Sequence, residues 1–94
     1  MPYIAAPAQD AFSDLLEEIN KAEIKTAGEL NFLFTRLAIR YIESNSLRYA
    51  FMNDVMGALE GAKLEFYRRV AEPYEAQKAF EADQDGVDPY ARLT

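Results

Sequence analysis

Residues 26–43 read TAGELNFLFTRLAIRYIE, and this stretch predicts the helix on which the fold depends. Thr26 and Glu29 fit the capping-box pattern, in which a hydroxyl and a carboxylate satisfy free backbone amides where a helix begins. Apolar residues then recur at three- and four-residue spacing, as in a helix with one face toward a core. Phe32 and Ile39 lie outside that stripe, so the helix is apolar around much of its circumference. Such a helix is central in its own domain or covered by another subunit.

Helical patterns also flank this stretch on both sides. Apolar residues at helical spacing predict a first helix over residues 8–24. Residues 44–46, Ser-Asn-Ser, predict a turn and the start of a long helix that runs to about residue 72. Pro73 is expected to end or kink this helix, because proline has no backbone N–H and clashes with the preceding turn. A short fourth helix is predicted over residues 74–82.

These patterns predict an all-α fold, because the sequence contains no internal repeat, hairpin signal or alternating strand pattern. We expect a compact bundle of three main helices plus a short C-terminal helix. Residues 1–82 are predicted to form the single helical domain, and residues 83–94 an acidic tail. Phe12, Phe34 and Phe66 lie on the apolar stripes and are expected in the core.

The composition favours a homo-oligomer that holds no metal or cofactor. A chain of 94 residues buries a smaller fraction of its surface than a larger one, so small domains often add a disulfide, a metal or a partner subunit. The absence of cysteine excludes disulfides and thiolate sites, and the absence of histidine removes the commonest metal ligand and general base. By elimination we expect a partner subunit, and we expect no catalytic residues.

The charge is distributed unevenly along the chain. The net charge of −6 argues against nonspecific DNA binding, which needs dense Lys and Arg. However, residues 28–69 hold six basic and five acidic side chains between two acidic ends, and five of the six are arginine. The sequence shows neither an apolar run long enough for a transmembrane helix nor a secretion signal. We therefore expect a cytoplasmic protein that does not contact membranes.

Eight residues of the middle and C-terminal helices are candidates for binding an anionic ligand. Arginine makes planar, paired hydrogen bonds to phosphate, and tyrosine stacks on bases. The candidates are Arg36, Arg40, Arg48, Lys63, Tyr67, Arg68, Arg69 and Tyr74. The alternative is a solvated surface in which Glu65 and Glu72 pair with neighbouring arginines at three- and four-residue spacing.

Five further residues are candidates for an oligomer interface. They are Phe32, Ile39, Gly57, Gly61 and Leu64. Each glycine in a helix interior costs about 1 kcal/mol relative to alanine, so two glycines one turn apart favour a structural explanation. One explanation is a close helix crossing, either within a protomer or at a two-fold interface. The alternative is that both glycines are tolerated on a solvated face.

Several motifs resemble those of a family of small proteins found mainly in bacteriophages and prophages. The resemblance covers residues 1–78 and implies a cellular context but no catalytic or binding residues. Its motifs are Met1-Pro2-Tyr3-Ile4, Gly28-Glu29-Leu30-Asn31, Asn53-Asp54-Val55-Met56-Gly57-Ala58-Leu59-Glu60, Glu65-Phe66-Tyr67-Arg68-Arg69 and Pro73-Tyr74-Glu75. The resemblance implies a phage protein that acts in the cytoplasm of the host bacterium.

In that context the sequence favours a non-enzymatic binding protein that counters a host defence process. Its target would be a host protein or a small anionic nucleotide, such as a cyclic or adenine-containing signal held by a homo-oligomer. The alternative is a structural or adaptor subunit of phage assembly or replication that acts through protein–protein contacts. An enzyme is disfavoured, because the sequence contains no motif with a catalytic mechanism.

Overall fold

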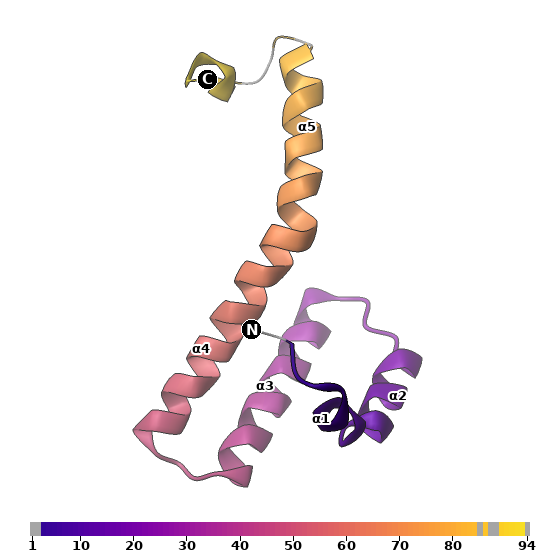
Figure 1. The fold of residues 1–94 in the computed structure, drawn as a ribbon, viewed down its shortest axis with the longest axis vertical. Coiled ribbons are helices and arrows are strands. Elements are labelled where there is room, and N and C mark those ends of the chain that lie inside the picture. Colours follow the sequence, from indigo (N-terminus) through magenta and orange to yellow (C-terminus); the bar gives the residue numbers. More distant parts are fainter. Residues whose placement is uncertain (1–2, 85, 87–88, 94) are drawn as a thin grey trace.

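The computed structural model describes residues 3–84, 86 and 89–93, and every regular element in these residues is helical (Figure 1). This confirms the predicted all-α class. The elements are α1 (Ala6–Asp10), α2 (Ser13–Lys21), α3 (Ala27–Ser44), α4 (Tyr49–Phe66), the π-helical turn η1 (Tyr67–Ala71), α5 (Glu72–Gln84) and the 3-10 helix η2 (Pro89–Leu93).

Helix α3 begins at the predicted capping box. The Thr26 side chain accepts a hydrogen bond from the Glu29 amide at 3.1 Å, and the Glu29 carboxylate accepts from the amides of Lys25 and Thr26, each at 2.9 Å. These bonds, first the one from the Lys25 amide and then the one from Thr26, hold the pKa of Glu29 below its usual value. The box therefore satisfies three backbone donors and fixes where the helix starts.

Replacing Thr26 with alanine should lower the free energy of unfolding by about 1 kcal/mol, the usual effect of losing an N-cap side chain. Urea denaturation followed by helical circular dichroism measures this loss. Thr35→Ala is the matched control, because the Thr35 hydroxyl donates to the Asn31 carbonyl within the same helix and caps no helix end. Equal losses in the two variants would show that the cap does not set the start of α3.

Helices α3 and α4 form an antiparallel hairpin joined by residues 45–48 (Figure 1). The Tyr41 hydroxyl donates to the Asp54 carboxylate at 2.7 Å, and this bond raises the pKa of Tyr41. The Tyr41 ring also meets Phe51 edge to face, with 6.1 Å between the ring centroids. Half-buried residues gather at this end of the hairpin, and they include Ala38, Ile42, Phe51 and Val55. The two helices are therefore packed most closely next to their connecting turn.

Helix α4 continues through η1 into α5 as one long rod. Of the two effects predicted for Pro73, the helix does not end there, because it extends to Gln84. It is kinked instead, because the rod changes direction at η1, directly before the proline (Figure 1). In this turn the Glu72 amide donates to the Tyr67 carbonyl, five residues back. A π turn widens the backbone directly before the proline, where an ordinary helix would clash with the proline ring. The predicted fourth helix is thus the continuation of the third.

Helices α1 and α2 together form the N-terminal arm, which differs from the single helix predicted over residues 8–24. The helical pattern is interrupted at Phe12, whose φ of −109° and ψ of 14° lie outside the helical range. The Phe12 amide donates to the Gln9 carbonyl at 2.9 Å and closes a tight turn there. Ala22 is extended and ends α2 three residues earlier than predicted. The arm lies beside α3, on the side away from α4 (Figure 1).

The described residues form no buried core. None of their side chains is fully buried, and the predicted core residues Phe12, Phe34 and Phe66 are 50%, 45% and 63% exposed. The chain exposes 8451 Å², whereas a compact protein of 10.7 kDa would expose about 5,500 Å². Its radius of gyration is 18.4 Å, compared with about 12 Å for a compact domain of this length. The single chain is therefore more extended than the compact bundle that the sequence predicted.

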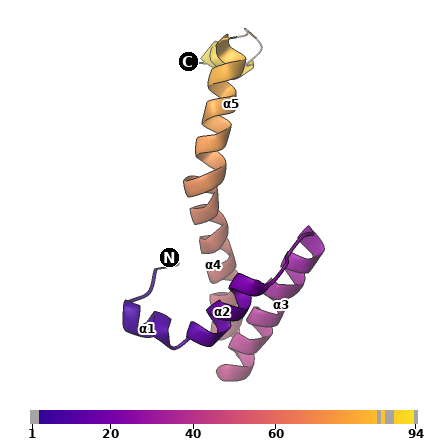
Figure 2. The same cartoon turned by 90° about the vertical axis from the view of Figure 1, so that its right-hand side faces the viewer.

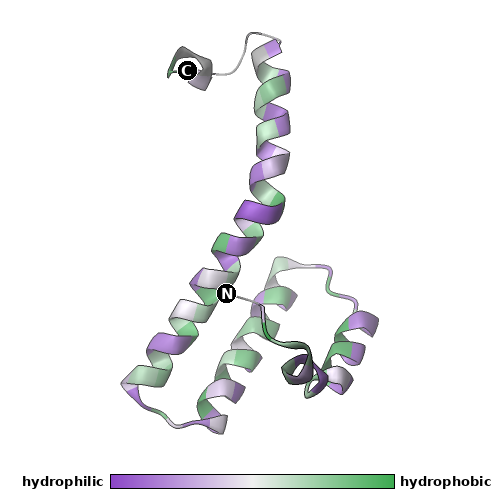
Figure 3. Ribbon diagram, in the orientation of Figure 1, coloured by the Kyte–Doolittle hydropathy of each residue, from purple (hydrophilic) through white to green (hydrophobic). Residues whose placement is uncertain are grey.

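The arrangement of the helices explains this exposure. Helix α5 extends beyond α1, α2 and α3, in the direction away from them (Figure 2). Apolar segments run along α2, α3 and α4 (Figure 3), and large apolar side chains of all three helices are exposed in the described structure. The spacing in the sequence predicted that these apolar residues share one face of each helix. Such a face is buried only if another element covers it. Within residues 3–84, 86 and 89–93 no other element buries these stripes.

The C-terminal part differs from the predicted tail in its boundary. Helix α5 continues to Gln84, past the boundary predicted between residues 82 and 83, and η2 follows with Leu93 81% exposed. Residues 85, 87, 88 and 94 of the predicted tail lie outside the described residues. Nowhere in the described part of the chain is there a helix both long and apolar enough to cross a bilayer.

Candidate functional site

The eight candidate ligand contacts do not converge in one chain. Arg36 and Arg40 lie on α3, Arg48 precedes α4, and the remaining five follow one another along the rod from Lys63 to Tyr74. Arg48 and Arg68 are twenty residues apart on nearly continuous helix, which corresponds to about 30 Å at the helical rise. A single copy therefore offers separate basic groups rather than one pocket.

Glu65 organises the basic group on the rod. Its carboxylate accepts hydrogen bonds from the Tyr3 hydroxyl at 2.9 Å and from Arg68 at 2.8 Å, and Arg69 Nε lies 3.8 Å from the same oxygen. The hydrogen bond from Arg68 and then that from Tyr3 lower the pKa of Glu65. Because Tyr3 lies far from the rod in sequence, this contact joins the N-terminus to the end of α4. Glu65 also offsets the positive charge of two candidate arginines.

The candidate tyrosines of the rod have partners as well. The Tyr67 hydroxyl donates to Glu75 at 2.9 Å, which raises the pKa of Tyr67, and the Lys78 ammonium lies 5.6 Å from the Tyr74 ring centroid. These contacts and the ion pairs of Glu65 agree with the alternative stated from the sequence, a solvated surface whose charged side chains pair with one another. The side chains of Arg68 and Arg69 nevertheless remain 61% and 62% exposed, so their outer faces are accessible to a ligand.

The contribution of Glu65 to stability should depend on pH. Its folded-state pKa is lowered, so the stabilisation is fully present above the ordinary carboxyl pKa and is lost as the pH falls through the folded value. Urea midpoints of the wild type and Glu65→Gln should therefore differ at neutral pH and converge in acid. Glu60→Gln is the control, because that carboxylate lies 3.9 Å from an exposed Lys63 and should matter little. A Glu65→Gln effect that does not change with pH would contradict this role.

Arg36 and Arg48 are the candidate cations most available to an outside anion. Arg40 lies 3.8 Å from Glu43, and Lys63 lies near Glu60. Among the residues that the structure describes, Arg36 and Arg48 form no ion pair. Their charge is therefore not offset by a close carboxylate in the described part of the chain.

The predicted interface residues are largely uncovered in the single chain. Phe32, Ile39 and Leu64 are 60%, 47% and 58% exposed. A Cβ placed on Gly57 would meet no atom within 4 Å, so no close helix crossing occurs there within the protomer. Gly61 is half-buried. Two of the explanations given for Gly57 therefore remain: a close contact between two copies, or a glycine tolerated on a solvated face.

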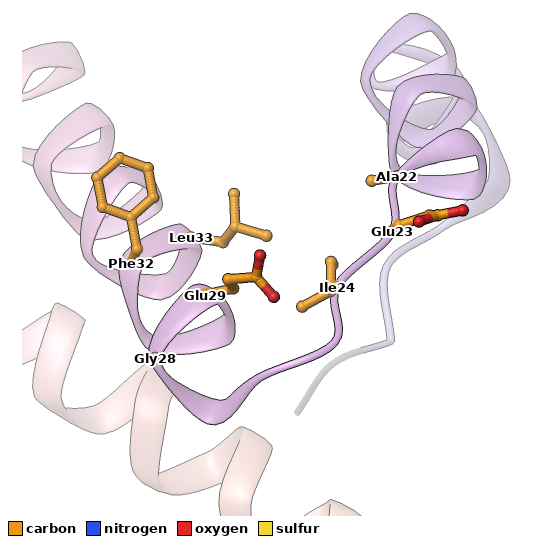
Figure 4. Close-up of a pocket in the computed structure, with 7 residues that line it drawn as sticks. All are labelled: Ala22, Glu23, Ile24, Gly28, Glu29, Phe32 and Leu33. Carbon is orange, nitrogen blue, oxygen red and sulfur yellow. The ribbon is translucent and has the colours of Figure 1, made fainter.

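An open cleft lies between the link after α2 and the beginning of α3 (Figure 4). Its volume is about 460 Å³, and its lining is mainly apolar. The carboxylate of Glu29 is already used by the helix cap. The lining residues are Ala22, Glu23, Ile24, Gly28, Glu29, Phe32 and Leu33. None of the eight candidate ligand contacts lies here, so the cleft suits an apolar side chain rather than an anion.

Among the residues that line this cleft, only Phe32 was predicted from the sequence to belong to a functional surface, the oligomer interface. The signal that could have found the cleft is Ile24, an apolar residue in the short link before the capping box. An apolar side chain in an otherwise polar link needs a surface to pack on. What it faces here depends on how the arm is placed relative to α3.

Comparisons with known proteins give one match. No curated protein and no solved structure matches the chain. The model of one protein family, described as a domain of unknown function (DUF6899), matches residues 1–84. This range includes the arm, the hairpin and the rod through the end of α5. The chain belongs to the DUF6899 family.

Proposed function

We propose that this chain is a phage-encoded, non-enzymatic binding protein that works as a homo-oligomer in the cytoplasm of the host bacterium and counters a host defence process. The observation that supports a binding role is the exposed apolar surface. The chain exposes about 2,900 Å² more than a compact protein of its mass, and its large apolar side chains contribute to that surface. Such surface is typical of proteins whose folded form includes a partner. The compact bundle expected from the sequence would then form from helices of more than one copy.

The target that we favour is a small anionic nucleotide. Two observations support it: Arg36 and Arg48 form no ion pair within the described residues, and Arg68 and Arg69 keep exposed guanidinium faces beside tyrosines. Guanidinium groups bind phosphate through paired hydrogen bonds, and aromatic rings stack on bases. Because these groups lie apart in one chain, the proposed site combines residues of two copies.

The second candidate is a structural or adaptor subunit of phage assembly or replication. The exposed apolar surface supports this function as well, because it suits a protein partner. The two candidates differ in the mass that the oligomer carries. A sequestering protein holds a ligand of a few hundred daltons, whereas an adaptor holds another polypeptide.

Native mass spectrometry of the protein purified gently from infected cells distinguishes these functions. We expect an oligomer with one small ligand per site, and the measured mass identifies that ligand. A bare oligomer that also fails to bind cyclic and linear adenine nucleotides in calorimetry would overturn the sequestration proposal. An oligomer bound to a host or phage polypeptide would establish the adaptor function instead.

Arginine variants then locate the site. Calorimetry with the identified nucleotide compares Arg36→Ala/Arg48→Ala with Arg68→Ala/Arg69→Ala, and Lys21→Ala is the control on the arm. We expect at least one arginine pair to lose about 1.5–3 kcal/mol of binding free energy per charged hydrogen bond removed. Binding that survives in both double variants would show that these arginines do not form the site.

A further inference from the structure

Helix α2 has an apolar face whose large side chains remain about half exposed in the described structure. This face consists of Leu15, Leu16 and Ile19 of the helix together with Phe12, the residue directly before it, and these side chains are between 45% and 50% exposed. Helix α2 has only nine residues, and isolated helices shorter than about 12–15 residues are marginal in water. The stability of this helix must therefore come from packing of its apolar face.

We propose that the apolar face of α2 packs against a second copy of this chain, and that the reciprocal contact closes a two-fold dimer. This inference rests on the proposed homo-oligomer and names the surface that forms it. In a two-fold interface the same patch serves both subunits, so each copy supplies the cover that the other lacks. The open cleft beside Ile24 and Phe32 receives apolar side chains of the second copy (Figure 4).

The exposed area is large enough for this interface. A standard stable interface buries about 800 Å² per partner, and obligate dimers bury about 1,000–2,500 Å² per partner. The chain exposes about 2,900 Å² beyond that of a compact protein of its mass, so an obligate interface fits within the excess. A second copy exposes the same excess area and the same apolar side chains, so the two copies can cover each other.

Charge complementarity also favours a second copy. The N-terminal arm, residues 6–21, carries four acidic side chains and one basic one, whereas the hairpin, residues 27–66, carries four basic and five acidic ones. Arg36 and Arg48 of the hairpin have no ion-pair partner among the described residues. Placing the acidic arm of one copy against Arg36 and Arg48 of the other brings opposite charges together beside the apolar contact, which favours this pairing.

Hydrogen exchange of the full-length protein, combined with light scattering, tests the proposal without any substitution. We expect a multiple of 10.7 kDa, and we expect the amides of residues 13–21 to exchange at least roughly a hundredfold slower than in an unpacked helix. This protection should fall on dilution, together with the oligomer mass. A single-chain mass with a protected arm would show that the arm closes on its own hairpin, and would overturn the proposal.

Two other results would also be decisive. An oligomer in which residues 27–66 are protected but residues 13–21 exchange freely would overturn the arm contact, while the proposed homo-oligomeric binding protein would stand. An oligomer with a protected arm that binds no nucleotide would support the arm contact, while sequestration would fail. The two proposals therefore fail separately.

A matched pair of variants places the contact on one face of α2. Ile19→Asp puts a charge on the apolar face, and Asn20→Asp puts the same charge one residue along, outside the four apolar residues. We expect Ile19→Asp to shift the protein to single chains at concentrations where Asn20→Asp remains oligomeric. If Ile19→Asp fails to fold, exchange in the unsubstituted protein still decides the question. Equal oligomer masses for the two folded variants would exclude this face as the interface.

Discussion

Diluting the protein a hundredfold will lower its free energy of unfolding by about 2.7 kcal/mol per mole of dimer, because each tenfold change in concentration is equivalent to about 1.4 kcal/mol. The physical reason is the absence of fully buried side chains among the described residues. A chain of this kind gains too little from burial alone to offset the entropy of ordering its backbone. Folding and association should therefore occur in one step.

The measurement is thermal unfolding over a hundredfold range of protein concentration, followed by circular dichroism. The midpoint should rise steadily with concentration. Asn20→Asp should show the same dependence, whereas Ile19→Asp should show a lower midpoint at every concentration. A cooperative transition whose midpoint does not change with concentration would mean that one chain is stable alone, and would contradict the proposed oligomer.

Replacing Phe51 with alanine should lower the free energy of unfolding by about 2 kcal/mol, somewhat less than the 3–5 kcal/mol usual at a fully buried phenylalanine. Phe51 is half-buried at the closest part of the hairpin and meets the Tyr41 ring edge to face. Such aromatic pairs contribute about 0.5–1.5 kcal/mol beyond the area that they bury. The substitution therefore removes both the packing and the ring contact.

Tyr49→Ala is the matched control for this prediction. Tyr49 lies two residues earlier in the same helix and is 75% exposed, so its loss should change stability by no more than about 0.5 kcal/mol. A double-mutant cycle with Tyr41→Ala isolates the ring contact, for which we expect a coupling of about 1 kcal/mol. If Phe51→Ala and Tyr49→Ala behave alike, the hairpin is not held together at this end.

Much of the local structure could be predicted from the sequence, because local interactions dominate it. The capping box at Thr26 and Glu29 fixes the start of α3, and the polar turn near Asn45 follows the end of that helix. In both places the determining groups are within four residues of each other. The all-α class follows in the same way from the apolar spacing, which requires no knowledge of what covers each stripe.

The candidate site could be predicted only as a set of residue types. The sequence shows that Arg36, Arg48 and Arg68 are cations with suitable chemistry, but it does not show how far apart they lie. The structure places them in separate groups and pairs Arg68 with Glu65. Glu65 also accepts a hydrogen bond from Tyr3, a contact across 62 residues that no local spacing rule could reveal.

By itself, the sequence determined the helical class, the cap of α3, the turn between α3 and α4, and the apolar character of the helices, because short-range backbone and side-chain preferences specify these features. Only the tertiary structure decided that the helix continues through Pro73 by way of a π turn, that the arm lies beside α3 on the side away from α4, and that the apolar stripes remain exposed in the described residues. Each of these outcomes depends on the balance between packing free energy and chain entropy over the whole molecule, which no local pattern contains.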